Sequence, residues 1–198
     1  MTREATVLIV PGLRDHVPQH WQTLLASRLP RVRTVEPMGR DLDCARKVAA
    51  IEREANAIKG PLLLVAHSGG VIMVVHWAKQ TQRAVHGALL ATPPDFERAM
   101  PAEYPTIDEL RAGGWLPVPR DRLPFSTIVA ASRNDPLGSF ERVAELARDW
   151  GSKLVDLGKV GHLNPASGFG DWAGADSLIA DLMDAPALVH NPTLTIEG

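Results

Sequence analysis

Short, continuous apolar runs alternate along the chain with longer amphipathic segments. The runs are rich in β-branched residues and do not alternate with polar ones, which is typical of strands buried on both faces of a sheet. The amphipathic segments have helical spacing, and in the clearest of them Ala45, Val48 and Ile51 share one face. The predicted strands are Ala5–Val10, Val32–Val35, Leu62–Ala66, Val85–Ala91, Thr127–Ser132 and Leu154–Leu157, and the predicted helices are Gln19–Leu29, Leu42–Ile58, Gly69–Gln82, Phe140–Trp150 and Ala175–Met183.

The regular alternation of strands and helices predicts an α/β fold with a parallel sheet and right-handed crossovers. Strands of this number, with helices on both faces, make one doubly wound domain, which we place at residues 1–185. Residues 92–126 interrupt the alternation with a proline-rich stretch, and a connection of this length is usually a lid or binding loop. Residues 186–198 form a C-terminal tail that we expect to be only partly ordered.

Composition narrows the class of protein. The chain is 45% hydrophobic and 22% charged with a net charge of −2, so it has no basic surface for nucleic acid. Its single cysteine, Cys44, excludes an internal disulfide and fits a reducing compartment. No apolar run reaches the roughly 20 residues of a membrane span, and the apolar stretch after Glu4 is too short for a signal peptide. We therefore expect a cytoplasmic protein with no membrane segment and no nucleic-acid partner.

The turn around Ser68 carries the clearest chemical signal. An apolar strand runs into the sequence AHSGG, residues 66–70, which matches a G-x-S-x-G nucleophile elbow with alanine at its first small position. Ala66 and Gly70 are small, as they must be where strand and helix close up. The Gly69 N–H and the helix dipole are expected to face a developing oxyanion. A serine that only caps a helix would give the same short match, but the flanking strand and helix favour a nucleophile.

Two later strands end in residues that complete a triad. The strand ending at Ser132 is followed by Asp135, and the strand ending at Leu157 is followed by His162. The carboxyl ends of parallel strands meet at one edge of a sheet, and the order serine, acid, histidine is the one this fold uses. Asp135 is expected to fix the tautomer of His162, which takes the proton of Ser68. Alternatively, Asn-Asp-Pro is a turn signal by itself, and His162 is a loop histidine without a role in catalysis.

The loop after the first strand offers a second oxyanion donor and part of a pocket. Gly12 allows the chain to turn so that the Leu13 N–H points toward the serine. Gly12, His20 and Trp21 are expected to line the acyl or leaving-group pocket, although Trp21 fits equally well as a core aromatic of the first helix. We expect no metal or cofactor, because no His/Cys/Asp cluster has ligand spacing and a triad needs none.

With these residues in view, the chain resembles the small serine hydrolases of the YdeN / retinoblastoma-binding protein 9-like family over nearly its whole length. The resemblance implies a single-domain, minimal α/β-hydrolase with a six-stranded parallel sheet in the order 2-1-3-4-5-6. It also implies Ser68 as nucleophile, Asp135 as acid and His162 as base. The matching stretches are PGLRDHVPQHWQ, VAHSGG, LLATPPDFE and the segment from Trp115 to Trp172 with its NDP, WGS and GHxNxxSGxGxW motifs.

Two positions depart from the family pattern. Ala66 stands where glycine is usual, which tightens the turn slightly, and Gly69 stands where a larger side chain is often seen, which we expect to loosen the elbow or widen the pocket. The ordered triad and the two oxyanion donors predict hydrolysis of small-molecule carboxylic esters through an acyl-serine. The short loop at residues 92–126 and the lack of a large cap favour short or small acyl groups. The same triad would also serve a thioesterase, an amidase or an acyltransferase. A protein-binding module on a hydrolase scaffold is a further alternative, since fold alone does not determine function.

Overall fold

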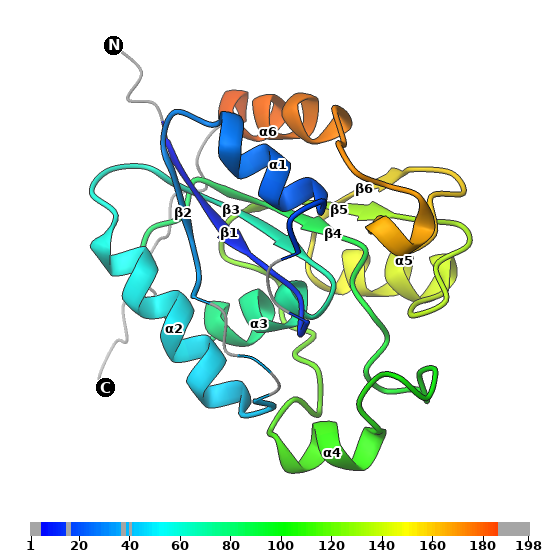
Figure 1. Ribbon diagram of the computed structural model, residues 1–198. Coiled ribbons are helices and arrows are strands. Elements are labelled where there is room, and N and C mark those ends of the chain that lie inside the picture. Colours follow the sequence, from blue (N-terminus) through cyan, green and yellow to red (C-terminus); the bar gives the residue numbers. More distant parts are fainter. Residues whose placement is uncertain (1–4, 15–16, 37–38, 40, 186–198) are drawn as a thin grey trace, which may run out of the picture.

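One parallel sheet organises the molecule (Figure 1). The computed structural model describes residues 5–14, 17–36, 39 and 41–185, so the predicted tail at 186–198 lies outside the described residues. The six strands follow the order β2-β1-β3-β4-β5-β6, as predicted. Every neighbouring pair is parallel. The strands are β1 (Thr6–Val10), β2 (Val32–Thr34), β3 (Leu62–His67), β4 (Gly87–Ala91), β5 (Ser126–Ala131) and β6 (Lys153–Asp156).

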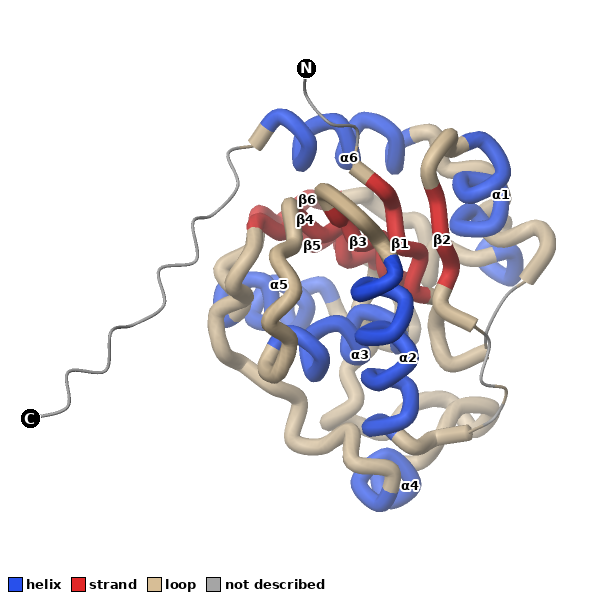
Figure 2. Tube along the Cα trace, turned by 90° about the vertical axis from the view of Figure 1, so that its left-hand side faces the viewer, coloured by secondary structure: helices blue, strands red, loops and turns tan. Residues whose placement is uncertain are grey.

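Helices cover both faces of the sheet, which lies between two helical layers in Figures 1 and 2. Each face buries its own apolar cluster: in β3, Leu64 and Ala66 belong to one cluster, while Leu63 and Val65 belong to the other. Because successive side chains of a strand point to opposite faces, burial on both faces explains the continuous apolar run. One layer holds α1 (Trp21–Arg28) and α6 (Gly174–Asp184), and the other holds α2 (Cys44–Ala57), α3 (Gly69–Ala78) and α5 (Phe140–Asp149).

The two edge strands differ from the prediction that every strand is buried on both faces. In β6, Lys153, Leu154 and Asp156 are exposed, and Leu154 is 37% exposed. No residue of β2 is fully buried. The prediction was wrong here because a run of three or four residues shows no alternation, whether its strand is central or at an edge.

The segment at residues 92–126 contains an unpredicted helix, α4 (Ile107–Ala112). Its start is marked by a capping box: the Thr106 side chain accepts from the Glu109 N–H, and the Glu109 carboxylate accepts from the Thr106 N–H. Trp115 follows the helix and is buried in the cluster beneath the sheet. The second half of the segment therefore packs on the layer of α2 and α3, at the bottom of Figures 1 and 2.

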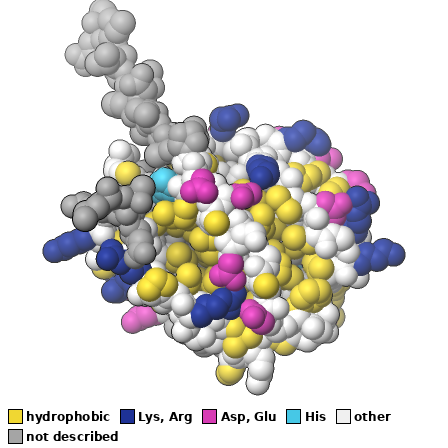
Figure 3. Space-filling view, turned by 90° about the horizontal axis from the view of Figure 1, so that it is seen from above, with side chains coloured by type: hydrophobic (Ala, Val, Ile, Leu, Met, Phe, Trp, Pro, Cys, Tyr) yellow, Lys and Arg dark blue, Asp and Glu magenta, His cyan; other side chains and the backbone are white. Residues whose placement is uncertain are grey.

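The face formed by α1 and α6 carries apolar side chains interspersed with charged ones (Figure 3). Arg28 of α1 bridges to Asp171 at 2.8 Å and to Asp176 of α6 at 2.7 Å, so ion pairs connect the two helices on this side. Among the described residues, no helix is both long and apolar enough to cross a membrane.

Candidate active site

Ser68 lies at the sharp turn between β3 and α3. Its backbone angles, φ 55° and ψ −131°, are uncommon for a residue with a Cβ atom. Although Ser68 precedes the first residue of α3, its hydroxyl makes no capping hydrogen bond and instead faces a cavity. A Cβ atom on Gly70 would lie 2.4 Å from the Val10 carbonyl oxygen and 2.5 Å from that of Pro11. The turn therefore requires glycine at position 70, as the sequence predicted.

The structure brings Ser68, Asp135 and His162 into one hydrogen-bonded line. His162 Nε2 lies 2.8 Å from Ser68 Oγ, and His162 Nδ1 lies 2.8 and 3.0 Å from the Asp135 carboxylate oxygens. The Asp135 side chain is 1% exposed and that of His162 is 5% exposed. Since water hardly reaches these two side chains, their hydrogen bonds are made to other groups of the protein. The arrangement allows proton transfer from Ser68 to His162, with Asp135 facing the opposite ring nitrogen.

Hydrogen bonds connect the loop carrying Asp135 to the loop carrying His162. Asp135 Oδ1 accepts from the Leu137 N–H at 2.9 Å, which orients the carboxylate. The neighbouring Asn134 side chain accepts from the Gly161 N–H at 2.7 Å and from the Ser132 hydroxyl at 3.0 Å. The acid loop is therefore attached to the residue directly before His162.

The loop after His162 folds back on itself. Ser167 Oγ accepts from the His162 N–H at 3.0 Å, and Asn164 Oδ1 accepts from both the N–H and the hydroxyl of Ser167 at 2.9 Å. A short 3₁₀ helix, Pro165–Ser167, closes this turn. Gly161 has a φ of 59°, and a Cβ atom there would lie 2.5 Å from Ser167 Oγ. Glycine at position 161 thus allows Ser167 to approach and accept the hydrogen bond from the His162 N–H.

A second histidine, His67, holds His162 from beneath. Its Nε2 lies 2.9 Å from the His162 carbonyl oxygen and donates to it, because a carbonyl only accepts. Its ring centroid lies 4.9 Å from that of His162 and 4.5 Å from that of His20. Burial, together with the neighbouring His162 and His20, holds the pKa of His67 well below its ordinary value, so this ring stays neutral. This role of His67 was not predicted, and its only signal in the sequence is the position of His67 beside Ser68.

The two predicted oxyanion donors lie beside the serine. A Cβ atom on Gly12 would lie 3.2 Å from Ser68 Cβ, so the first loop passes directly over the elbow. A Cβ atom on Gly69 would lie 3.4 Å from the Leu13 nitrogen and 2.7 Å from Leu13 Cγ. The Gly69 N–H is in the first turn of α3, where no acceptor exists within the helix. The Leu13 side chain therefore lies in the space that a larger side chain at position 69 would enter.

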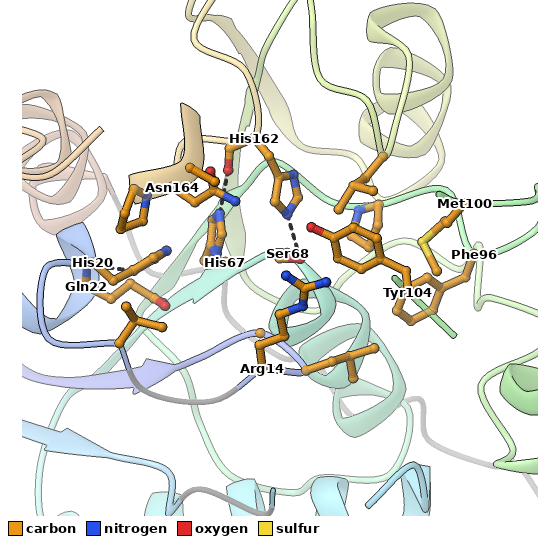
Figure 4. A pocket seen from close by; sticks show the side chains of 17 residues that line it. Arg14, His20, Gln22, His67, Ser68, Phe96, Met100, Tyr104, His162 and Asn164 are labelled. Atoms are coloured by element: carbon orange, nitrogen blue, oxygen red, sulfur yellow. Dashed lines mark hydrogen bonds between the residues drawn. The ribbon is translucent and has the colours of Figure 1, made fainter. Parts of the chain in front are cut away.

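A cavity of about 220 Å³ opens in front of Ser68 (Figure 4). Of the three residues predicted to line the pocket, Gly12 and His20 lie in the cavity wall and Trp21 does not. Trp21 is 1% exposed and packs edge-on against Trp172 with ring centroids 4.9 Å apart. Of the two interpretations of Trp21, pocket residue or core aromatic of the first helix, the packing supports the core aromatic.

Part of the cavity wall comes from the segment at residues 92–126. The sequence predicted a lid or binding loop in this segment. Among the described residues, no group of three or more His, Cys, Asp or Glu side chains is placed to hold a metal ion. The lining residues from this segment are Pro94, Phe96, Met100 and Tyr104.

Comparisons with known proteins identify the family to which the chain belongs. A sequence model of the family described as serine hydrolase matches residues 7–181. A search of curated proteins found no match. Among solved structures, the chain is similar to a YdeN-like hydrolase from Pectobacterium atrosepticum, with 32% identity, 91% of each chain covered and a TM-score of 0.77.

Two more distant structures share the fold alone. The ydeN gene product of B. subtilis is 17% identical, with 92% of this chain and 100% of that chain covered and a TM-score of 0.70. Est1E from Butyrivibrio proteoclasticus, solved with ferulic acid bound, is 11% identical, with 93% and 92% covered and a TM-score of 0.70. On the family match and the Pectobacterium structure together, the chain belongs to the serine hydrolase family, among its small YdeN-like members, and is an enzyme with the α/β-hydrolase fold.

Proposed function

We propose that this enzyme hydrolyses carboxylic esters of small molecules through an acyl intermediate on Ser68. The observation that carries the proposal is the hydrogen-bonded line from Asp135 through His162 to Ser68, which ends at a cavity large enough for a small substrate. A serine hydroxyl is a poor nucleophile by itself, and this line supplies the base and the group that orients the base.

The first half of the reaction uses His162 as a base. As Ser68 Oγ attacks the ester carbonyl, its proton moves to His162 Nε2, 2.8 Å away. The Asp135 carboxylate, 2.8 Å from Nδ1, keeps the other ring proton on Nδ1 and stabilises the imidazolium that forms. The Leu13 and Gly69 N–H groups stabilise the carbonyl oxygen as it becomes negatively charged.

The second half reverses these roles. His162 returns its proton to the leaving alcohol oxygen, the C–O bond breaks, and the acyl group remains on Ser68. A water molecule then enters, loses a proton to His162 Nε2 and attacks the acyl carbon. Collapse of this second intermediate breaks the bond to Ser68 Oγ, which regains its proton from His162, and the carboxylic acid leaves.

The size and chemistry of the cavity support a small acyl group. Its volume of about 220 Å³ lies below the usual range of pockets for drug-sized ligands, roughly 300–1,000 Å³. Phe96, Met100 and Pro94 make one wall apolar, which favours an alkyl or aryl group next to the carbonyl. A series of 4-nitrophenyl esters of increasing chain length is therefore expected to show falling kcat/KM beyond short acyl groups.

Replacing Ser68 by alanine tests the proposal directly. We expect turnover of 4-nitrophenyl acetate to fall by on the order of 10³–10⁶ and labelling by a fluorophosphonate to disappear. Ser27→Ala is the matched control, because Ser27 is exposed on α1 and is expected to leave both readouts unchanged. Retained turnover in Ser68→Ala would refute the nucleophile. Absence of labelling in the native protein would favour the protein-binding alternative, while thioester or amide analogues cleaved in preference to esters would change the substrate class.

The cytoplasm is the compartment we propose for this enzyme. The proposal rests on the single cysteine, Cys44, which is buried. Burial, with a smaller contribution from Asp43, raises the pKa of its thiol to about 12, so Cys44 is held as an unreactive thiol. Fractionation of cells that express the tagged chain, followed by activity in each fraction, tests the location.

A further inference from the structure

Arg14 and Tyr104 meet at the cavity although they are far apart in sequence. The guanidinium carbon of Arg14 lies 4.3 Å from the centre of the Tyr104 ring, and Nη2 donates to the Glu103 carbonyl oxygen at 3.1 Å. In Figure 4 the two side chains are drawn against each other in front of Ser68. Stacking and this hydrogen bond orient an otherwise exposed side chain, so its charge has a defined place in the cavity wall.

Arg14 brings a positive charge to the cavity wall. Among the described lining residues, it is the only Lys or Arg, and none is Asp or Glu. Among the described residues, the hydrogen-bond acceptor of Arg14 is the Glu103 backbone carbonyl and not a carboxylate. Most of the remaining wall is apolar, including Phe96 and Met100. A positive charge beside apolar walls interacts more strongly with an incoming anion than it would in open water.

We propose that Arg14 is a specificity-determining residue that selects esters carrying a carboxylate near the scissile bond. This inference rests on the proposed ester hydrolysis at Ser68. The planar guanidinium presents parallel N–H donors that match the two oxygens of a carboxylate. A single cation balances one negative charge, so a carboxylate fits better than a phosphate dianion. The carboxylate is supplied either by the acyl part or by the alcohol part of the substrate.

The ring of Tyr104 is the platform for this recognition. Burial, as the largest cause, raises the pKa of Tyr104, so its hydroxyl stays neutral near pH 7. The contact with Arg14 is made through the face of the ring. Tyr104→Phe keeps that face and is expected to preserve the preference for an anionic substrate. Tyr104→Ala removes the platform and is expected to reduce the preference.

The test compares substrates that differ only in charge. On the acyl side, the pair is the mono-4-nitrophenyl ester of adipic acid and the 4-nitrophenyl ester of adipamic acid, in which a carboxamide replaces the carboxylate. On the alcohol side, the pair is 2-carboxyethyl butyrate and 2-carbamoylethyl butyrate. The readout is the ratio of kcat/KM within a pair, corrected for spontaneous hydrolysis. This ratio does not change when a variant merely lowers overall activity.

We expect the native enzyme to favour the carboxylate by about two- to fivefold in one of the two pairs, the upper part of the range for one exposed ion pair. Arg14→Gln should bring that ratio to about one, and Arg14→Lys should leave an intermediate ratio because charge remains without the planar fork. The preference should also fall as salt is added. Arg53→Gln is the control, since Arg53 is exposed on α2 and is expected to keep the native ratio.

Equal ratios in the native enzyme and in Arg14→Gln, with neutral esters still cleaved, would overturn the role of Arg14 and leave ester hydrolysis at Ser68 intact. No cleavage of any ester by the native enzyme, with no fluorophosphonate label, would overturn both proposals.

Discussion

Replacing Asp135 by asparagine tests how the site fixes the proton on His162. In the native site, Asp135 Oδ1 accepts from the Leu137 N–H at 2.9 Å, and Oδ2 lies 2.8 Å from His162 Nδ1. An asparagine would keep its amide oxygen facing the Leu137 N–H, so its NH₂ group would face Nδ1. An amide NH₂ only donates, so Nδ1 would have to accept and the ring proton would move to Nε2. His162 would then present a proton to Ser68 where a base is needed.

The expected loss is large because the site offers no substitute. The Asp135 side chain is 1% exposed, so water cannot take over its bond to Nδ1. The wrong tautomer of a catalytic histidine costs about 10⁴ in kcat, which corresponds to about 5 kcal/mol of transition-state stabilisation. Binding of the ester is expected to change much less, since Asp135 does not line the cavity.

The assay is steady-state turnover of a 4-nitrophenyl ester by Asp135→Asn, with ¹⁵N NMR of the His162 ring to identify the tautomer. Thermal unfolding checks that the variant is folded. Asp156→Asn is the matched control: Asp156 is a carboxylate on the neighbouring strand, paired with exposed Arg133, and is expected to leave kcat within about twofold. A folded Asp135→Asn variant with turnover within tenfold of native, or with the proton still on Nδ1, would refute this reasoning.

Three further predictions follow from packing and burial. Gly70→Ala places a Cβ atom 2.4 Å from the Val10 carbonyl oxygen, so we expect the unfolding free energy to fall by about 1–3 kcal/mol. An unchanged melting temperature would contradict this close approach. Burial lowers the pKa of His67 in the folded protein below its unfolded value near 6.5, so the unfolded chain binds more protons in acid. The unfolding free energy should therefore fall as the pH drops below about 6.5, by up to ~1.4 kcal/mol per pH unit. Urea unfolding at pH 5 and 7 should show a smaller pH effect in His67→Gln, and an equal effect would count against neutral burial. Trp21→Phe should leave the acyl chain-length preference unchanged, whereas a shifted preference would restore Trp21 as a pocket residue.

The strands and most helices could be predicted because their signal is local. The apolar run Leu62–Ala66 is continuous since both of its faces are buried, and its length and flanks indicate the strand directly. Helix α4 was not predicted because its six residues are too few to show a helical period, although the sequence contains the Thr106 and Glu109 capping box. The exposure of the edge strands β2 and β6 was not predicted, because the place of a strand in a sheet depends on which strands pair. A short apolar run carries no information on that pairing.

The line of Asp135, His162 and Ser68 was predictable for a different reason. Parallel strands end at one edge of a sheet, so residues just beyond three strand ends are brought together whatever the intervening sequence. The supporting contacts were not predictable. The bond from His67 to the His162 backbone joins residues 95 positions apart, and nothing in a lone elbow histidine specifies where its ring will point.

By itself, the sequence determined the alternation of strands and helices, the elbow at Ser68 and the loops that carry its partners, because these depend on hydrophobic period and on small residues at a turn. Only the tertiary structure decided that Trp21 joins the core, that Leu13 fills the space above Gly69, and that Arg14 meets Tyr104 at the cavity. These outcomes depend on which side chains compete for the same volume and which loops approach one another, and such competition is resolved only when the chain packs in three dimensions.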